Sequence, residues 1–214
     1  MLEVPARFIT IEGGEGVGKS LFTQKFSEGL AGLGVKHKTT REPGGTPIAD
    51  RLRSIFHAPP ENEQLTIESE LCIICAARAQ HIHHVIKPEL KKNSWVICDR
   101  FSDSSRVYQG AIGGVQLDLL EQINSLVCYG LQPDLTFVLD CDVRTSLARI
   151  QERVDDGAEA SRYDKAQVEF HQKVRDGFLE LSVSFPDRMV VLDASRATEQ
   201  SVVEALDVVR DRFL

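Results

Sequence analysis

The chain has 214 residues, of which 42% are hydrophobic and 27% charged, and its net charge is −7. This composition suits one α/β domain with a substantial core and argues against intrinsic disorder. The acidic balance and the lack of a long basic run argue against a protein that follows nucleic-acid backbones, and no apolar stretch approaches the roughly 20 residues of a membrane helix.

The first predicted element is a strand at Phe8–Ile11, which the N-terminus reaches without a signal-peptide pattern, so we expect a cytoplasmic protein. The next residues, 13–20, read GGEGVGKS and fit the phosphate-loop motif G-x-x-x-x-G-K-[ST]. Apolar residues then recur at helical spacing from Phe22 to Leu33. The loop therefore joins a strand to a helix N-terminus, where backbone N–H groups and the helix dipole attract anions.

Eight residues form this loop and are expected to bind ATP: Gly13, Gly14, Glu15, Gly16, Val17, Gly18, Lys19 and Ser20. We expect Lys19 to reach the β and γ phosphates and the Ser20 hydroxyl to hold Mg²⁺. Glu15 places a carboxylate among groups that attract anions, so it should point away from phosphate, toward a hydroxyl or a cation. A sugar hydroxyl of a second substrate is one candidate, and a solvated side chain is the alternative.

Further strand-like runs follow at Lys36–Thr40, Trp95–Cys98, Leu135–Leu139 and Met189–Leu192, with helical patterns between them. This alternation predicts a five-stranded parallel sheet covered by helices on both faces. Ligands of such sheets bind beyond the carboxyl ends of the strands. Residues 41–45 and 99–101 fall there and are candidates for the site.

The segment 66–86 predicts one helix, with an apolar stripe at Ile67, Leu71, Ile74, Ile82 and Val85. Arg78 lies in phase with that stripe, so it needs polar partners. Either the edge of a nucleobase or an acidic residue of the protein could supply them.

The same segment contains a C-x-x-C pair and a histidine cluster. We interpret Cys72 and Cys75 as buried free thiols, because no second Cys/His pair has zinc-finger spacing. We interpret His81, His83 and His84 as a polar helix surface.

Asp99 ends the third apolar strand, as an aspartate that binds Mg²⁺ would. Asp140 ends the fourth strand and is the alternative; Asp99 is favoured because Arg100 and the polar run 102–105 follow it. Beside a phosphate site, Arg100 indicates a clamp on an acceptor phosphate, and a surface ion pair is the alternative.

Three arginines surround a polar loop near residue 157. Arg149 and Arg153 are four residues apart and share one helix face, and Arg162 follows the loop. This pattern is typical of a mobile lid that closes on phosphates, although a solvated helix end fits equally well.

Several sequence landmarks together resemble bacterial thymidylate kinases. In chain order they are residues 12–20, 41–46 (REPGGT), 76–78 with Gln80, 85–88 (VIKP), 99–101 (DRF), 104–105, 108–110 (YQG), 133–136 (PDLT) and 139–140. The resemblance runs from about residue 7 to the C-terminus, and the combination is far more specific than the phosphate loop alone.

The resemblance implies a P-loop nucleoside-monophosphate-kinase fold: a five-stranded parallel sheet wrapped by helices, in one domain (1–214) with a lid at about 149–164. The implied reaction transfers a phosphoryl group from ATP to dTMP, giving dTDP for dTTP synthesis, with Mg²⁺. The family commonly forms homodimers, so a homodimer is expected, with neither nucleic acid nor membrane as a partner.

The resemblance also assigns roles. Glu15 matches the carboxylate that binds the deoxyribose 3′-hydroxyl, and Arg100, assisted by Arg53, matches the acceptor-phosphate site. The remaining substrate-binding positions are Pro43, Ile74, Arg78, Ser105 and Gln109, the last three at the thymine edge. Arg149, Arg153 and Arg162 match the lid, and Arg149 is also expected to bind ATP. Eukaryotic-type relatives have an arginine where this chain has Gly16, so Lys19 and Arg100 are expected to work with lid arginines 149 and 153 in catalysis.

One position departs from the family pattern. Ile74 stands where the family usually has a phenylalanine that stacks on thymine, a contact worth about 1–3 kcal/mol. The departure leaves a kinase for another pyrimidine monophosphate (dUMP or UMP) as the nearest alternative. A P-loop ATPase switch that acts through a protein partner is a more distant one.

Overall fold

Five parallel strands form the centre of the computed structural model, which describes residues 5–60 and 62–214. The strands are β1 (Phe8–Glu12), β2 (His37–Arg41), β3 (Trp95–Asp99), β4 (Leu135–Asp140) and β5 (Met189–Asp193). Their order is β2-β3-β1-β4-β5, and every pairing is parallel. This confirms the predicted fold class. The order changes direction beside β1, where a ligand crevice is expected.

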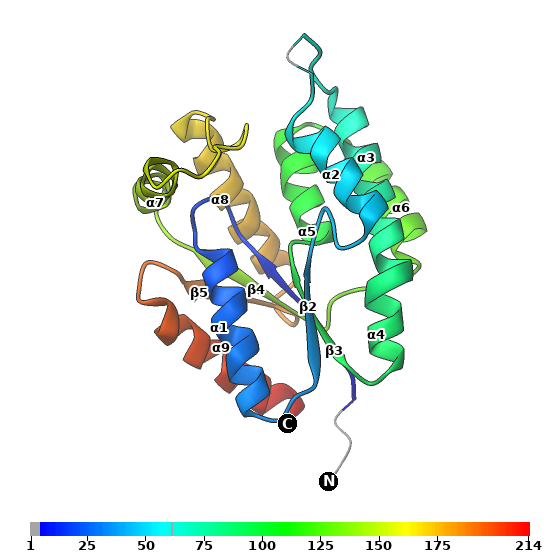
Figure 1. Ribbon diagram of the computed structural model, residues 1–214, viewed down its shortest axis with the longest axis vertical. Helices are drawn as coiled ribbons and strands as arrows, with labels where there is room; N and C mark the ends of the chain where they lie inside the picture. Colours follow the sequence, from blue (N-terminus) through cyan, green and yellow to red (C-terminus); the bar gives the residue numbers. More distant parts are fainter. Residues whose placement is uncertain (1–4, 61) are drawn as a thin grey trace.

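Helices cover both faces of the sheet (Figure 1). On one face lie α1 (Lys19–Gly32) and α9 (Thr198–Phe213), which pack Phe22, Phe26 and Leu206 against Ile9 and Phe137. On the other face lie α3 (Ile67–His81), η1 (Ile82–Ile86), α6 (Leu117–Cys128) and α8 (Val168–Ser184). The remaining elements are α2 (Pro47–His57), α4 (Lys87–Lys91), α5 (Ser102–Ser105), η2 (Arg106–Ile112) and α7 (Val143–Asp155).

The predicted helix over 66–86 is present, but it changes type at its end. Thr66 caps α3 by accepting a hydrogen bond from the Ser69 N–H, and the last turn continues as the π-helical segment η1. Leu71, Ile74 and Ile82 of the predicted stripe are buried. The interpretation of the cysteine pair was wrong in part: Cys72 is exposed, whereas Cys75 is buried, and both are free thiols.

His81 is not a surface residue, contrary to the interpretation made from sequence. It is fully buried, and its ring nitrogens make hydrogen bonds with Glu42 (2.9 Å) and the Thr40 hydroxyl (2.6 Å). The sequence could not show this because both partners come from β2 and the loop after it, about 40 residues away. His83 and His84 are exposed, as expected.

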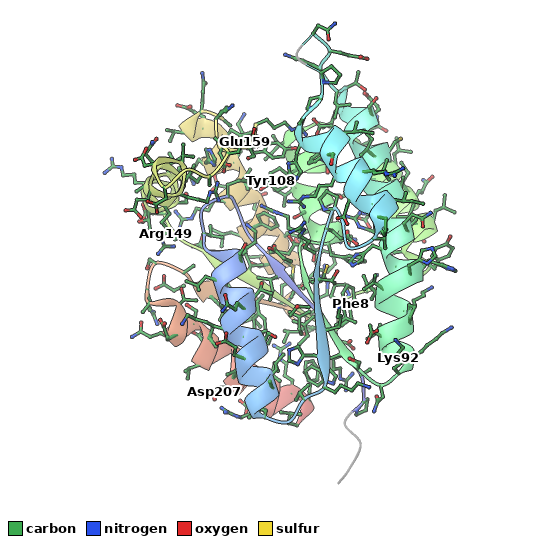
Figure 2. All side chains as sticks on the ribbon, in the orientation of Figure 1. Phe8, Lys92, Tyr108, Arg149, Glu159 and Asp207 are labelled. Carbon is green, nitrogen blue, oxygen red and sulfur yellow. The ribbon has the colours of Figure 1, made fainter. Side chains whose placement is uncertain are left out.

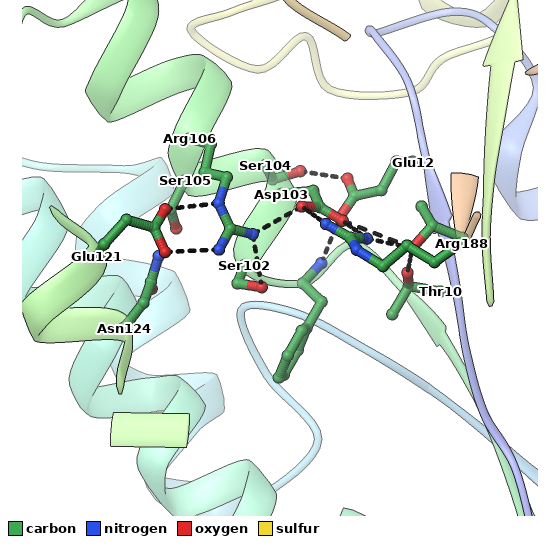
Figure 3. Close-up of polar contacts among 12 residues, drawn as sticks. Thr10, Glu12, Ser102, Asp103, Ser104, Ser105, Arg106, Glu121, Asn124 and Arg188 are labelled. Carbon is green, nitrogen blue, oxygen red and sulfur yellow. Dashed lines mark hydrogen bonds and ion pairs between the residues drawn. The ribbon is translucent and has the colours of Figure 1, made fainter. Parts of the chain in front are cut away.

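A buried polar network fixes the start of α5 beneath the candidate site (Figure 3). Asp103 accepts hydrogen bonds from Arg106 (2.7 Å) and from Arg188 (2.7 and 2.8 Å), while Glu12 accepts from the Phe101 N–H and the Ser104 hydroxyl. Burial, together with the charge of Asp103, raises the pKa of Glu12 to about 7. The network holds the segment carrying Arg100 and Ser105 against the end of β1.

Within the residues that the structure describes, no helix is long and apolar enough to cross a membrane.

Candidate active site

The phosphate loop lies between β1 and α1, as predicted. Gly13 has φ +132°, and a Cβ there would lie 2.5 Å from the Leu139 carbonyl oxygen, so only glycine fits. At Gly16, with φ +73°, a Cβ would lie 2.2 Å from the Ser146 carbonyl oxygen. The loop therefore has no room for an arginine at residue 16, and any transition-state arginine must come from elsewhere.

Lys19 folds over the loop. Its Nζ donates hydrogen bonds to the carbonyl oxygens of Gly13 (3.0 Å) and Gly14. Burial, and the nearby positive charge of Arg100, lower the pKa of Lys19 to about 8. An ammonium group held at the loop centre is suited to neutralising phosphate oxygens.

A cavity opens beside the loop at the carboxyl ends of β2 and β3. It is partly open to solvent, and charged, polar and aromatic side chains line it. Its lining includes ten of the predicted site residues, eight of which are Glu15, Lys19, Pro43, Arg53, Ile74, Arg78, Asp99 and Arg100. Ser105 and Gln109 also line it.

Glu15 points away from the phosphate loop, toward donors, as expected from its chemistry. Its carboxylate accepts hydrogen bonds from the Tyr108 hydroxyl (2.8 Å to each oxygen) and from Arg100 Nη2 (2.9 Å). The side chain is only 12% exposed, so the solvated alternative is wrong. Both donors belong to the protein, and contact with a sugar hydroxyl stays a prediction.

Arg100 lies between the phosphate loop and the cavity. Its Nη1 donates to the carbonyl oxygen of Gly13 (3.0 Å) and to the Ser104 hydroxyl (3.1 Å). Burial opposes its charged form, but the surrounding Tyr108, Glu15 and Asp99 more than offset burial and raise its pKa. The backbone of Arg100 has φ +69°, a conformation that residues other than glycine rarely adopt. Such backbone conformations are concentrated at functional sites. Arg53 Nη1 donates to the Pro43 carbonyl oxygen (2.8 Å) on the same wall of the cavity.

Arg78 makes an intramolecular ion pair, which was one of its two predicted environments. Its Nε donates to Glu42 (2.7 Å), and its Nη atoms donate to Asn124, the Phe101 carbonyl oxygen and Ser105. The side chain is 1% exposed. A guanidinium has five N–H groups, and these four bonds leave one on Nη1. Arg78 can therefore donate only one hydrogen bond to the edge of a base, and it cannot bind that edge in a bidentate manner.

Asp99 and Ser20 line one hollow beside the loop. Within the described residues, Asp99 Oδ1 is buried and has no hydrogen-bond partner, as expected of an oxygen that can bind a cation. The alternative, Asp140, is held by two hydrogen bonds from Arg175 (2.7 and 2.9 Å). These contacts favour Asp99 as the Mg²⁺ ligand.

The predicted lid arginines do not act as one cluster. Arg149 donates to the Ala194 carbonyl oxygen (2.9 Å), Arg153 pairs with Asp164 (2.8 Å), and Arg162 pairs with Glu70 (2.5 Å). Figure 2 shows Arg149 on α7, at the side of the molecule, apart from Tyr108 in the cavity.

Sequence reasoning gave no role to four further residues of the cavity wall: Phe56, His57, Tyr108 and Tyr163. His57 is surrounded by arginines; burial, and the charge of Arg53, lower its pKa to about 4, so its ring is neutral. Within the described residues its buried Nε2 has no partner. Only Tyr108 had a signal in the sequence, as part of the YQG landmark.

The parallel sheet has a phosphate loop after β1, and an arginine-lined cavity lies beside that loop. Together these features define a P-loop phosphotransferase of the nucleoside-monophosphate-kinase class.

Comparison with known proteins gives the family. The family model for thymidylate kinase matches residues 11–205. The thymidylate kinase of Geobacter sp. (strain M21) is 42% identical over 208 residues, covering 96% of this chain and 92% of that relative. The thymidylate kinase of Magnetococcus marinus is 40% identical over 207 residues, covering 97% of both. The crystal structure of thymidylate kinase from Ehrlichia chaffeensis has a TM-score of 0.75 at 30% identity, covering 95% of this chain and 98% of that one. The chain belongs to the thymidylate kinase family.

Proposed function

We propose that this protein transfers the γ-phosphoryl group of ATP to dTMP, giving ADP and dTDP for dTTP synthesis. The observation that carries the proposal is the acceptor cavity, which adjoins the phosphate loop through Glu15 and Arg100 and belongs to a chain of the thymidylate kinase family. We assign one kinase domain, with the lid at 149–164, to residues 1–214.

In this reaction the phosphate loop and Lys19 bind the donor phosphates, and Arg100 and Arg53 align the acceptor phosphate. Phosphoryl transfer depends mainly on such positioning and on charge stabilisation. Ser20 and Asp99 would hold Mg²⁺, which supplies positive charge to the donor phosphates when bound. Arg149 and Arg153 are assigned to the transition state, because Gly16 leaves no room for an arginine in the loop.

At the base end, Ser105, Gln109 and one N–H group of Arg78 face a pyrimidine edge, and Ile74 covers part of the ring. The nearest alternative acceptors are dUMP and UMP.

Release of ADP in a coupled assay tests the proposal, measured with no acceptor and then with dTMP, dUMP and UMP. We expect release to require an acceptor and to be most efficient with dTMP, with dTDP identified by chromatography. Release that does not depend on any acceptor would instead indicate an ATPase switch.

The protein is also proposed to be a cytoplasmic homodimer. In support, α6 exposes Leu119 (50%) and Leu126 (72%), which are seven residues apart and share one helix face. Light scattering on the purified protein tests the oligomeric state.

Glu15→Gln is expected to weaken the discrimination between dTMP and its 3′-deoxy analogue. A carboxylate that accepts a hydroxyl makes a charge-assisted bond of roughly 1.5–3 kcal/mol, so loss of the 3′-hydroxyl should reduce kcat/KM of the parent by about 10- to 150-fold and of the variant far less. Tyr108→Phe is the control, since it removes another donor to Glu15 but keeps the carboxylate. Equal discrimination in parent and Glu15→Gln would place the 3′-hydroxyl elsewhere.

Ile74→Phe is expected to tighten dTMP binding. Ile74 is 7% exposed and lines the same cavity as Arg78, one helical turn away, so a phenylalanine there could stack on the base. The gain should be at most about 1–3 kcal/mol, and smaller if the larger ring overpacks the wall. Calorimetric titration of dTMP measures it. An unchanged affinity in a well-folded variant would mean that another ring already covers the base.

A further inference from the structure

Arg162 packs against two residues of the acceptor-cavity wall, Phe56 and Tyr163, although it was expected to act with the phosphate-directed lid. Its Nη1 is 2.5 Å from Glu70 of α3, and its guanidinium carbon lies 4.4 Å from the centre of the Phe56 ring of α2. In Figure 1 the segment between α7 and α8 is the yellow loop at the upper left, across from the helices α2 and α3. These contacts join the lid to the helices that form the opposite wall of the cavity.

The next residue, Tyr163, makes part of the cavity wall itself. Its ring stacks on Phe170 (5.5 Å between centroids, 8° between planes) and lies 5.1 Å from the ring of Tyr108. Its hydroxyl accepts from Arg162 Nη2 (3.0 Å) and donates to Glu70 Oε2 (3.4 Å). Burial, together with the charge of Glu70, raises the pKa of this hydroxyl, so it stays protonated and can donate. The position of this aromatic wall therefore depends on Glu70.

Glu70 is 8% exposed and accepts from a third group inside the cavity. Gln109 Nε2 donates to Glu70 Oε2 (3.4 Å), and within the described residues the buried Gln109 Oε1 accepts no hydrogen bond. A carboxylate can only accept hydrogen bonds, so Glu70 selects the amide orientation in which Nε2 faces it. Oε1 is then left as an acceptor for a donor on the ligand, such as the ring N–H of a thymine or uracil base.

A buried carboxylate needs a cation close by, since an unpaired buried charge is strongly destabilising. Arg162 provides that cation, and it does so from the lid. The position of the lid and the orientation of Gln109 therefore both depend on the side chain of Glu70.

We propose that Glu70, Arg162 and Tyr163 form a lid latch: Glu70 is a positioning residue that holds the lid over the base end of the acceptor cavity and orients Gln109 to read a ring N–H donor. Arg162 accordingly acts through Glu70 and not on the transferred phosphate. The identity of the base rests on the proposed function, whereas the latch itself does not.

A kinetic double-mutant cycle with Glu70→Gln, Arg162→Gln and the double variant tests the latch. Each single change should raise KM for dTMP by about 10-fold or more, the size expected on losing a hydrogen bond to a charged group, with a smaller change in kcat. The double variant should be little worse than either single one, because both remove the same pair. Arg210→Gln, which breaks an exposed ion pair with Asp207 on α9, is the matched control and should change neither parameter.

Two further measurements separate positioning from loss of stability. Glu70→Gln should reduce the ratio of the dCMP to the dTMP dissociation constant, because the amide of Gln109 is no longer held in one orientation; Arg162→Gln should leave this ratio largely intact. Thermal midpoints identify a variant that merely unfolds. Glu70→Asp keeps the charge and should retain part of the dTMP affinity.

Limited trypsin digestion tests the latch without any turnover. Cleavage after Lys165 should be faster in Glu70→Gln and in Arg162→Gln than in the parent and in Arg210→Gln.

The latch would be overturned by unchanged cleavage, or by increases in KM for dTMP that multiply in the double variant. A large fall in kcat with KM unchanged in Arg162→Gln would return this residue to the chemical step. A parent that makes no dTDP yet shows the cleavage pattern would overturn the proposed function and leave the latch standing.

Discussion

Replacing Lys19 with alanine is expected to reduce phosphoryl transfer on the order of 10³-fold or more while the fold stays intact, a loss comparable with that of an arginine that stabilises the transition state. The reason is its place at the centre of the loop, where Nζ already contacts the carbonyl oxygens of Gly13 and Gly14. Its lowered pKa shows that its charge is held in an unfavourable environment, which phosphate oxygens would relieve. Removing the charge should leave the donor phosphates poorly neutralised.

The matched control for this prediction is Lys25→Ala. Lys25 lies on the same helix, α1, and makes an ion pair with Glu199 (2.8 Å) at the surface. Turnover with ATP and dTMP should be near normal in this variant, and the thermal midpoints of both variants should stay close to that of the parent. Substantial activity in Lys19→Ala would move the donor site away from residues 13–20.

The strands other than β2 could be predicted to within a residue of each end because they are short apolar runs between turn or polar residues. β1, with every residue buried, is such a run, and Asp99 and Asp140 mark the ends of β3 and β4. β2, whose ends were also predicted to within a residue, is mostly exposed and has no apolar run, but it contains the β-branched residues Thr39 and Thr40, which favour strands.

The contacts of the buried polar residues could not be predicted in the same way. Helical periodicity places Arg78 on the buried face of α3, but it cannot say whether Glu42 or a ligand meets it there. That choice depends on how the loop after β2 packs on α3, a relation between segments 36 residues apart. His81 was misjudged for the same reason, since its partners Thr40 and Glu42 come from that same stretch.

The lid shows how far spacing alone can go. Arg149 and Arg153 were correctly placed on one helix, α7, yet the structure gives each arginine of the lid a different partner. Their four-residue spacing fixes a common face and not a common target. The aromatic wall of the cavity was missed because Phe56 and Tyr163 come from α2 and the lid, and neither lies in a recognisable motif.

The double variant Arg149→Ala, Arg153→Ala is expected to reduce kcat by roughly 10³- to 10⁵-fold, the range for an arginine supplied to a phosphoryl-transfer transition state, with a much smaller effect on KM for dTMP. Gly16 cannot carry a side chain, so the loop offers no replacement. Each single variant should lose less, because two arginines can share the developing charge. Single-turnover measurements with bound ATP and dTMP isolate the chemical step.

Two controls show whether these arginines act on the reaction or only support the lid. Arg144→Ala changes an exposed arginine on the same helix and should have little effect. Asp164→Asn breaks the ion pair that Arg153 makes within the lid but keeps both arginines. If Asp164→Asn lost as much kcat as Arg153→Ala, Arg153 would serve the lid's structure and the transition-state charge would fall to Arg149. If the double variant kept the parent's kcat, neither residue would reach the transferred phosphate, and the charge would have to be met by Lys19 and Arg100 alone.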